Sequence, residues 1–271
     1  MIYTHVHPDL DALASAWLAR RLRGGREEVR FVSAGWEGPV PEGDLAVDIA
    51  CGLKGRADPA TGRVSSALRL LLERPEAEPY REPLGALLDL VEAQDTTGHA
   101  VETLAGPGVP EAVRAHCLPA LVEAARRSLG EDLLLFEWAS VVFEGLLRLR
   151  REREEERARA ARARWFGPVA LAEGRAAAEL FARGARAVVY HEGRNVGVLR
   201  AKDETFHLGA ILEPWLRARG LREGWFFHPA GFLACHGSRK SPADRPCPVD
   251  PEEIARRIQE FLGTGPEHSR K

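Results

Sequence analysis

Two histidines and two aspartates stand within seven residues near the start of the chain, in the stretch THVHPDLDALASAW (residues 4–17). His5 and His7 follow a short apolar run, and Asp9 and Asp11 open a segment with helical spacing. Hard divalent cations prefer carboxylate oxygens, and an imidazole shifts the preference toward Mn, Fe or Zn. Carboxylates that crowd together repel one another unless a cation lies between them. The stretch therefore predicts a mixed nitrogen and oxygen site suited to Mn²⁺ or Mg²⁺.

A simpler interpretation of the same residues needs no metal. Asp9 can be the N-cap of the following helix, because its side chain can accept a hydrogen bond from a backbone N–H of the first turn. Asp11 can be a first-turn acid that faces the positive end of the helix dipole. His5 and His7 would then be ordinary polar residues.

The elements around this stretch alternate between strands and helices. Strands are predicted at 1–6, 29–35 and 44–51, and helices at 10–22, 61–74 and 83–94. This alternation predicts an α/β domain with a parallel sheet. Ligands of such sheets bind at the carboxyl ends of the strands. His5, Asp9 and Asp11 fall at one such end, Asp48 falls at another, and Asp95 follows the helix at 83–94.

The rest of the chain suggests two α/β domains joined by a helix. The predicted segments are a metal-binding α/β domain at 1–129, a connecting helix at 130–165, a smaller substrate-binding α/β domain at 166–263 and a disordered tail at 264–271. The second half of the connecting helix carries charges of both signs, which is typical of an exposed helix with i,i+4 ion pairs. A dimerising helix is the alternative, so a homodimer stays open.

The composition excludes several classes of partner. The net charge is −2 over 271 residues, so no global positive field favours duplex DNA. The sequence shows no signal peptide and no run of about 18 apolar residues, so we expect no membrane span. The four cysteines form no CxxC pair, which is typical of free thiols in a reducing cytoplasm.

The stretch HVHPDLDALASA resembles the first motif of the DHH phosphoesterase superfamily, which includes RecJ-like exonucleases, cyclic-dinucleotide phosphodiesterases and the melanocyte-proliferating-gene family of metal-dependent hydrolases. The segment VDIACG resembles the second motif, and LLDLVEAQDTTG resembles a later aspartate motif. The resemblance implies that the metal ligands are His5, Asp9, Asp11, Asp48 and Asp95. It further implies that Asp9, Asp11 and Asp48 take part in catalysis.

Near the other end, WFFHPAGFLACHGS resembles the glycine-rich substrate-binding stretch of the superfamily's C-terminal domain. The resemblance implies that His228 and Gly231 contact the substrate. Just beyond, HGSRK (236–240) offers Ser238, Arg239, Lys240 and backbone N–H groups after a glycine, a composition that suits a phosphate or carboxylate. The alternative for this segment is a solvated loop.

One motif departs from the superfamily pattern. The Asp-His-His that names the superfamily is expected between Asp48 and Asp95, where the chain reads GLKGRADPATGRVSSAL. Asp58 can stand for the aspartate, but Pro59 and Ala60 replace the two histidines. Lys54 and Arg56 in the same loop could hold a phosphate directly, and His7 or His99 could supply a replacement ligand.

Two functions therefore stay open. The first is a divalent-metal-dependent phosphoesterase, in which a metal ion lowers the pKa of the attacking water. Its substrate would be a nucleotide, a short single-stranded oligonucleotide or a small phosphorylated molecule, held in a cleft between the domains. The second is a protein of the same fold that has lost catalysis and binds a phosphorylated ligand as a sensor or regulatory partner.

Overall fold

Three short parallel strands form the first sheet, in the order β2–β1–β3. They are β1 (Ile2–His5), β2 (Val29–Val32) and β3 (Leu45–Ala46). In the register of the sheet, His5 lies opposite Val32 and Tyr3 lies opposite Ala46. The computed structural model, which describes residues 1–55 and 65–264, thus confirms the predicted parallel α/β arrangement at the N-terminus.

Helices pack on one face of this sheet and bury the main core of the first unit. They are α1 (Leu10–Leu22), α2 (Ala67–Leu72), α3 (Glu78–Thr97) and the long α7 (Asp132–Ala161). Helix α1 is buried from Leu10 to Ala19, and its Leu13 and Leu18 meet Phe136 and Phe143 of α7 in the same core cluster. On the other face, Trp36 stacks on Tyr3 with a ring-centroid distance of 5.2 Å.

Several elements were not predicted. A 3₁₀ turn, η1 (Pro75–Ala77), precedes α3, and three helices follow it: α4 (Ala100–Ala105), α5 (Glu111–Arg114) and α6 (Leu118–Leu129). The connecting helix α7 ends at Ala161, four residues before its predicted end, and a further strand, β4 (Arg164–Phe166), begins just after it.

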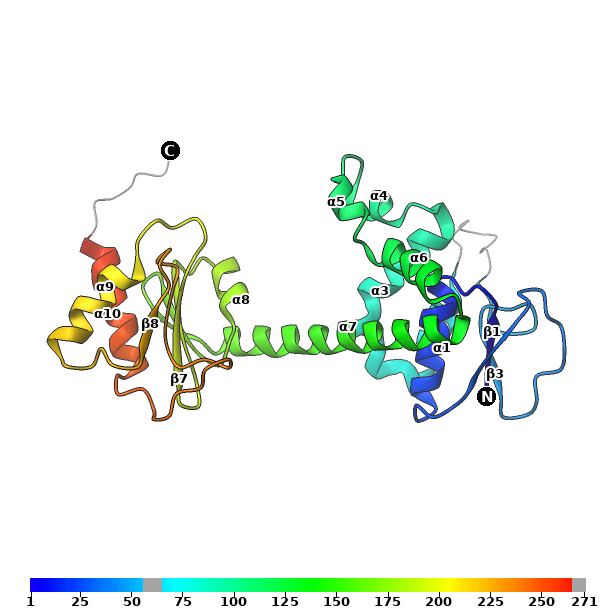
Figure 1. Ribbon diagram of the computed structural model, residues 1–271, viewed down its shortest axis with the longest axis horizontal. Helices are drawn as coiled ribbons and strands as arrows, with labels where there is room; N and C mark the ends of the chain where they lie inside the picture. Colours follow the sequence, from blue (N-terminus) through cyan, green and yellow to red (C-terminus); the bar gives the residue numbers. More distant parts are fainter. Residues whose placement is uncertain (56–64, 265–271) are drawn as a thin grey trace. The chain divides into compact units, whose positions relative to one another are not determined.

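The chain divides into two compact units within α7, at Arg151 and Glu152 (Figure 1). The predicted domain boundaries at 129/130 and 165/166 stay predictions. Of the tail predicted to be disordered at 264–271, Thr264 is helical instead, and residues 265–271 lie outside the described residues. Over the described part of the chain, no helix is long and apolar enough to cross a membrane.

A six-stranded mixed sheet forms the centre of the second unit, in the order β4–β5–β6–β7–β9–β8. The remaining strands are β5 (Val169–Glu173), β6 (Ala187–Glu192), β7 (Asn195–Arg200), β8 (Trp225–Phe227) and β9 (Leu233–His236). Strands β5 and β6 are parallel, whereas β6 and β7 form an antiparallel hairpin.

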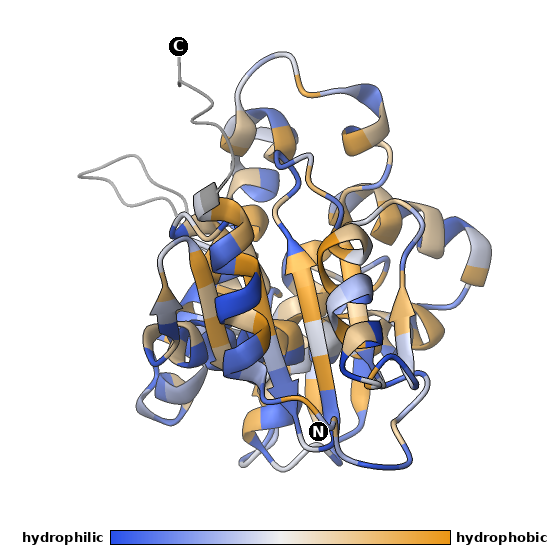
Figure 2. Ribbon diagram, turned by 90° about the vertical axis from the view of Figure 1, so that its left-hand side faces the viewer, coloured by the Kyte–Doolittle hydropathy of each residue, from blue (hydrophilic) through white to orange (hydrophobic). Residues whose placement is uncertain are grey.

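Helices cover both faces of this second sheet. Helices α9 (Leu208–Ala218) and α10 (Pro251–Thr264) share one apolar cluster with the strands, and α8 (Ala177–Ala182) contributes to another. Figure 2 shows apolar strands behind helices whose outer faces are hydrophilic. The second unit is therefore an α/β layer structure with its own core, as the fold class predicts.

Candidate metal centre

His5 ends strand β1 and turns its imidazole toward two carboxylates. Its side chain is 14% exposed. The ring nitrogen Nδ1 lies 2.9 Å from the Val6 carbonyl, to which a protonated Nδ1 would donate. This bond selects the tautomer in which Nε2 carries the lone pair, and such a backbone partner is typical of metal-binding histidines. Nε2 is therefore the atom that a cation would meet.

Asp9 serves two purposes in the structure. Its Oδ1 accepts a hydrogen bond of 3.0 Å from the backbone N–H of Ala12, so Asp9 is the N-cap of α1. Its other oxygen, Oδ2, lies 3.8 Å from Nε2 of His5. The simple capping interpretation is therefore correct for one oxygen, and the second oxygen is free to bind a cation.

Asp48, in the segment after β3, also places its carboxylate beside the His5 imidazole. Its backbone has a φ of +52°, a left-handed conformation that is uncommon for a residue with a side chain, and its N–H donates to the Leu53 carbonyl at 2.7 Å. Its Oδ2 lies 3.2 Å from Nε2 of His5. Backbone strain of this kind is concentrated at functional sites.

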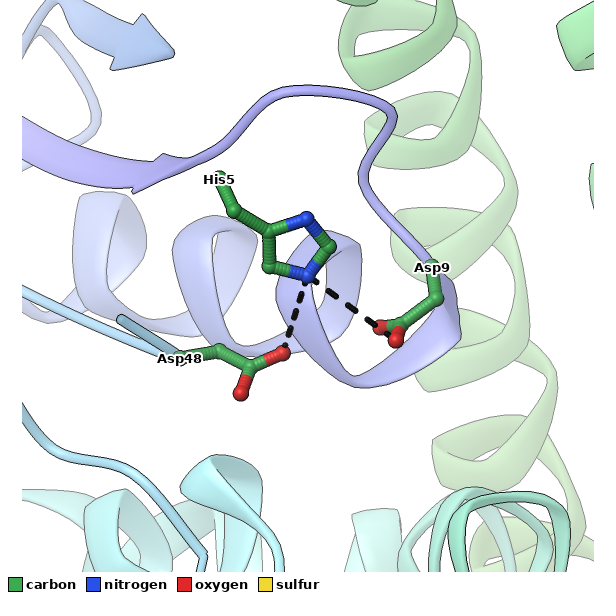
Figure 3. Close-up of side chains that lie close together, drawn as sticks. All are labelled: His5, Asp9 and Asp48. Atoms are coloured by element: carbon green, nitrogen blue, oxygen red, sulfur yellow. Dashed lines mark hydrogen bonds and ion pairs between the residues drawn. The ribbon is translucent and has the colours of Figure 1, made fainter. Parts of the chain in front are cut away.

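His5, Asp9 and Asp48 form a three-donor group (Figure 3), with one ligand atom from each within 4.8 Å of the other two. An octahedral ion with bonds of about 2.1 Å places adjacent ligands about 3.0 Å apart and opposite ones about 4.2 Å apart. The separations of 3.2 and 3.8 Å from Nε2 lie within this range. One nitrogen and two oxygens therefore fit a divalent cation such as Mn²⁺ without large rearrangement.

The charges of His5, Asp9 and Asp48 act strongly on one another. The hydrogen bond to Asp48 raises the pKa of His5 to about 9; burial opposes this rise, and the Val6 carbonyl and the Asp9 charge support it. The metal-free site therefore holds a proton between the imidazole and the carboxylates at neutral pH. Partial burial and the charges of Asp9 and Asp48 raise the pKa of Asp95 to about 6.

Asp11 is placed differently from its two predicted neighbours. It is 2% exposed, and its carboxylate accepts hydrogen bonds from the Ser15 hydroxyl at 2.9 Å, the Ala67 N–H at 2.7 Å and the Leu68 N–H at 3.0 Å. It therefore joins α1 to the first turn of α2. Burial raises the pKa of Asp11 to about 7, and these three hydrogen bonds oppose the rise. A role for Asp11 as a ligand stays a prediction.

The other predicted residues of the first unit do not join the three-donor group. Asp95 lies in the last turn of α3, close enough for the charges of Asp9 and Asp48 to act on its carboxyl. The side chains of His7 and His99 are exposed, and neither belongs to the group. Lys54 is exposed, and its charge acts on Asp95. Arg56, Asp58, Pro59 and Ala60 lie outside the described residues.

The predicted substrate residues of the second unit fall on two loops. His228 follows β8, accepts a hydrogen bond from the Ala230 N–H through Nδ1 and packs on the Phe232 ring at 4.3 Å. Gly231 lies beside His207, which caps α9. In the other loop, Arg239 pairs with Glu192 and the Ser238 hydroxyl accepts from the Ser241 N–H. Lys240 has no ion-pair partner among the described residues.

Fold and side chains together define an α/β protein with one nitrogen and two oxygen donors, from His5, Asp9 and Asp48, grouped closely enough that they could hold a metal ion. No protein-family model matches the sequence, and no curated protein matches it. Nine solved chains do match in structure, and three of them are described next.

One match is the pGpG-specific phosphodiesterase PggH of Vibrio cholerae, with 11% identity and a TM-score of 0.36 over 96% of each chain. Another is the exonuclease RecJ bound to manganese, with 16% identity and a TM-score of 0.36 over 98% of this chain and 90% of RecJ. RecJ of Thermus thermophilus with Mg²⁺ gives 15% identity and a TM-score of 0.34, over 98% of this chain and 50% of that one. At these identities and TM-scores, the activity of this chain has to be inferred from its own residues.

Proposed function

We propose that this chain is a divalent-metal-dependent phosphoesterase that holds one Mn²⁺ or Mg²⁺ ion at His5, Asp9 and Asp48. The observation that carries the proposal is the meeting of Nε2 of His5 with Oδ2 of Asp48 and Oδ2 of Asp9, at 3.2 and 3.8 Å. The Val6 carbonyl fixes the imidazole in the orientation that a metal ligand needs. A bound cation would neutralise the charges that meet there.

The residues around the site supply orientation and charge. When bound, the cation would lower the pKa of water and polarise a phosphoryl oxygen. The cap made by Asp9 Oδ1 holds that side chain so that Oδ2 faces His5. Burial and the charges of Asp9 and Asp48 raise the pKa of Asp95 to about 6, and we propose that its carboxylate completes the coordination shell or accepts a proton.

The proposed substrate is a phosphoester: a nucleotide, a short single-stranded oligonucleotide or a small phosphorylated molecule. Its proposed contacts are Lys54, Arg56, His228, Gly231, Ser238, Arg239 and Lys240. Lysine and arginine side chains bind phosphate oxygens as charged donors. Lys54 and Lys240 support this role best, because neither has an ion-pair partner among the described residues.

The test compares Asp48→Asn with Asp89→Asn, an equal loss of charge at an exposed aspartate of α3. Full-length protein is freed of metal, titrated with Mn²⁺ by electron paramagnetic resonance and assayed on mononucleotide, dinucleotide and nitrophenyl phosphoesters. The expected result is one bound ion and metal-dependent hydrolysis in the wild type and Asp89→Asn, and neither in Asp48→Asn. A wild type that binds no Mn²⁺ at millimolar concentration would overturn the proposal.

The second candidate is a protein that binds a phosphorylated ligand without hydrolysing it. One observation favours it: backbone and hydroxyl donors occupy the carboxylate of Asp11, so a single three-donor group remains among the described residues. In the same assay, this candidate predicts Mn²⁺ binding and phosphoester binding by the wild type with no turnover of any substrate.

A further inference from the structure

The loop between β1 and α1 is held by two side chains from distant parts of the chain. Both carboxylate oxygens of Asp132 accept the backbone N–H of His7, each at 3.1 Å. The guanidinium of Arg126 donates to the Pro8 carbonyl at 2.9 Å. Asp132 and Arg126 are 125 and 118 positions away from their partners, so the contacts depend on tertiary packing.

The backbone at His7 explains why such contacts are needed. His7 has a φ of +52°, in the left-handed region that residues other than glycine rarely adopt. It stands two residues after His5 and two residues before Asp9. The turn at His7 therefore decides whether the end of β1 and the start of α1 bring these two side chains to 3.8 Å. A strained turn persists only where its surroundings hold it.

The two side chains that hold the loop both lie at the corner where α6 meets α7. Arg126 lies in the last turn of α6, and Asp132 is the first residue of α7. Gly130, with a φ of +72°, makes the turn between the two helices. Glu123 binds the Arg126 guanidinium at 2.6 Å and so orients it toward Pro8. In the first unit, α6 and α7 lie beside α1 (Figure 1), which places this corner against the loop.

An ordinary helix-end role explains Asp132 only in part. An acid in the first turn of a helix is stabilised by the helix dipole. Glu131 next to it could supply the same charge, yet Asp132 alone directs both oxygens at one backbone N–H of another segment. Both oxygens of Asp132 bind the N–H of His7, and Arg126 binds the carbonyl of the next residue, Pro8. The two contacts together point to a role in shaping the loop.

We propose that Asp132 and Arg126 are positioning residues of the cation centre, which hold the loop through the backbone of His7 and Pro8 so that His5 and Asp9 face the same ion. This inference rests on the proposed function, since it assigns both residues to the shaping of that centre. Partners that orient metal ligands typically change metal affinity by about 10- to 100-fold when they are removed.

The first experiment measures Mn²⁺ affinity of the full-length chain by electron paramagnetic resonance. Asp132→Ala is compared with Glu131→Ala, which removes the same charge one residue away. We expect the dissociation constant to rise at least about tenfold in Asp132→Ala and to stay unchanged in Glu131→Ala. His7→Ala should also leave it unchanged, because the backbone N–H remains. Equal affinity in Asp132→Ala and the wild type overturns the proposal.

A second pair of variants separates positioning from a general loss of structure. His7→Gly removes the cost of the left-handed turn, so the double variant His7→Gly with Asp132→Ala should recover part of the lost affinity. Arg126→Lys keeps a donor for the Pro8 carbonyl and should bind Mn²⁺ more tightly than Arg126→Ala. If the double variant binds Mn²⁺ no more tightly than Asp132→Ala, then Asp132 does not act by holding the left-handed turn at His7, and the proposal fails.

Amide hydrogen exchange of His7 in the metal-free chain distinguishes this inference from the proposed function. We expect slow exchange in the wild type and in Glu131→Ala, and fast exchange in Asp132→Ala. Slow exchange in a wild type that binds no Mn²⁺ would show that Asp132 holds the loop, and it would overturn the cation centre and with it the proposed function. Equally fast exchange in the wild type and Asp132→Ala would overturn the positioning role of Asp132, whatever the metal result.

Discussion

Nε2 of His5 and Oδ2 of Asp48 lie 3.2 Å apart, although 43 positions separate the two residues. The sheet explains this approach. Tyr3 of β1 pairs with Ala46 of β3 in parallel register, and His5 and Asp48 each stand two residues further along. The parallel register therefore brings both residues to the same edge of the sheet, where the backbone of Asp48 turns into a left-handed conformation with a φ of +52°. Without a cation, a proton joins the two groups, so protons and cations compete for the same nitrogen.

This competition predicts pH-dependent cation binding. The hydrogen bond to Asp48 raises the pKa of His5 to about 9, so the imidazole is protonated at neutral pH and has to release a proton when an ion binds. The apparent dissociation constant for Mn²⁺ should fall about tenfold per pH unit between about pH 7 and 8, and level off near pH 9. Anaerobic Mn²⁺ titrations at several pH values measure this slope. A constant affinity over that range would contradict the assignment of His5 as a ligand.

The raised pKa of His5 also predicts how the free energy of unfolding of the metal-free chain depends on pH. A histidine whose pKa is higher in the folded state stabilises that state fully below its unfolded value of 6.5, and the contribution disappears as the pH rises to about 9. The difference between these pKa values corresponds to roughly 3 kcal/mol. Urea unfolding in EDTA should show this loss in the wild type. His5→Asn, which does not titrate, should lack it; an equal pH dependence in both proteins would show that other groups cause it.

A third prediction concerns Asp11. Asp11→Ala leaves the N–H groups of Ala67 and Leu68 without their partners in a buried place, so the free energy of unfolding should fall by about 2–4 kcal/mol. Ser66→Ala, which removes the side-chain cap of the same helix, should cost only about 1 kcal/mol. Denaturant unfolding at neutral pH compares the two variants.

Asp11→Asn tests the ligand role that the first motif implies. It keeps one acceptor oxygen for α2, so the protein should fold and bind one Mn²⁺ per chain with near-normal affinity. Loss of the ion from a folded Asp11→Asn chain would show that Asp11 is a ligand in addition to its contacts with α2.

Local patterns in the sequence predict much of this site. The helical spacing after Asp9 predicts both α1 and its cap, and the position of Asp48 after an apolar run predicts its place at the edge of the sheet. The partners of Asp11 and Asp132 could not be predicted, because each contact joins segments more than 50 residues apart whose approach depends on packing. Helix α6 is a different case, because its apolar residues at 118–129 recur with helical spacing and local sequence alone accounts for it.

The predicted end of the connecting helix at residue 165 differs from the observed end at Ala161 for a physical reason. The charged segment after Arg148 has no proline and has strong helix formers, so local propensity alone extends the helix through Trp165. In the structure Arg164, Trp165 and Phe166 pair with β5 instead, and Phe166 joins the core of the second unit. Burial of an aromatic side chain against a sheet outweighs helix propensity there.

The last prediction tests the glycine in the loop after β8. Gly231 has a φ of +73°, and a Cβ atom would stand 2.3 Å from the His207 ring. Gly231→Ala should therefore lower the free energy of unfolding by about 2–4 kcal/mol, as left-handed strain and overpacking add. Gly220→Ala is the matched control, because Gly220 has a φ of +68° and open space around it, and it should lose only about 1–2 kcal/mol. Chemical denaturation compares the two variants.

The same pair of variants separates substrate contacts from cation binding. The Gly231 N–H donates to the His228 carbonyl at 2.8 Å, and its own carbonyl accepts the Leu208 N–H at 2.9 Å, so a displaced Gly231 moves both His228 and the start of α9. Mn²⁺ affinity should not change, because the three proposed ligands lie in the first unit. If His228 contacts the phosphoester, KM should rise in Gly231→Ala and stay constant in Gly220→Ala. An unchanged KM in a folded Gly231→Ala protein would remove His228 and Gly231 from the proposed substrate site and leave the loop at 238–240 as the anion-binding candidate.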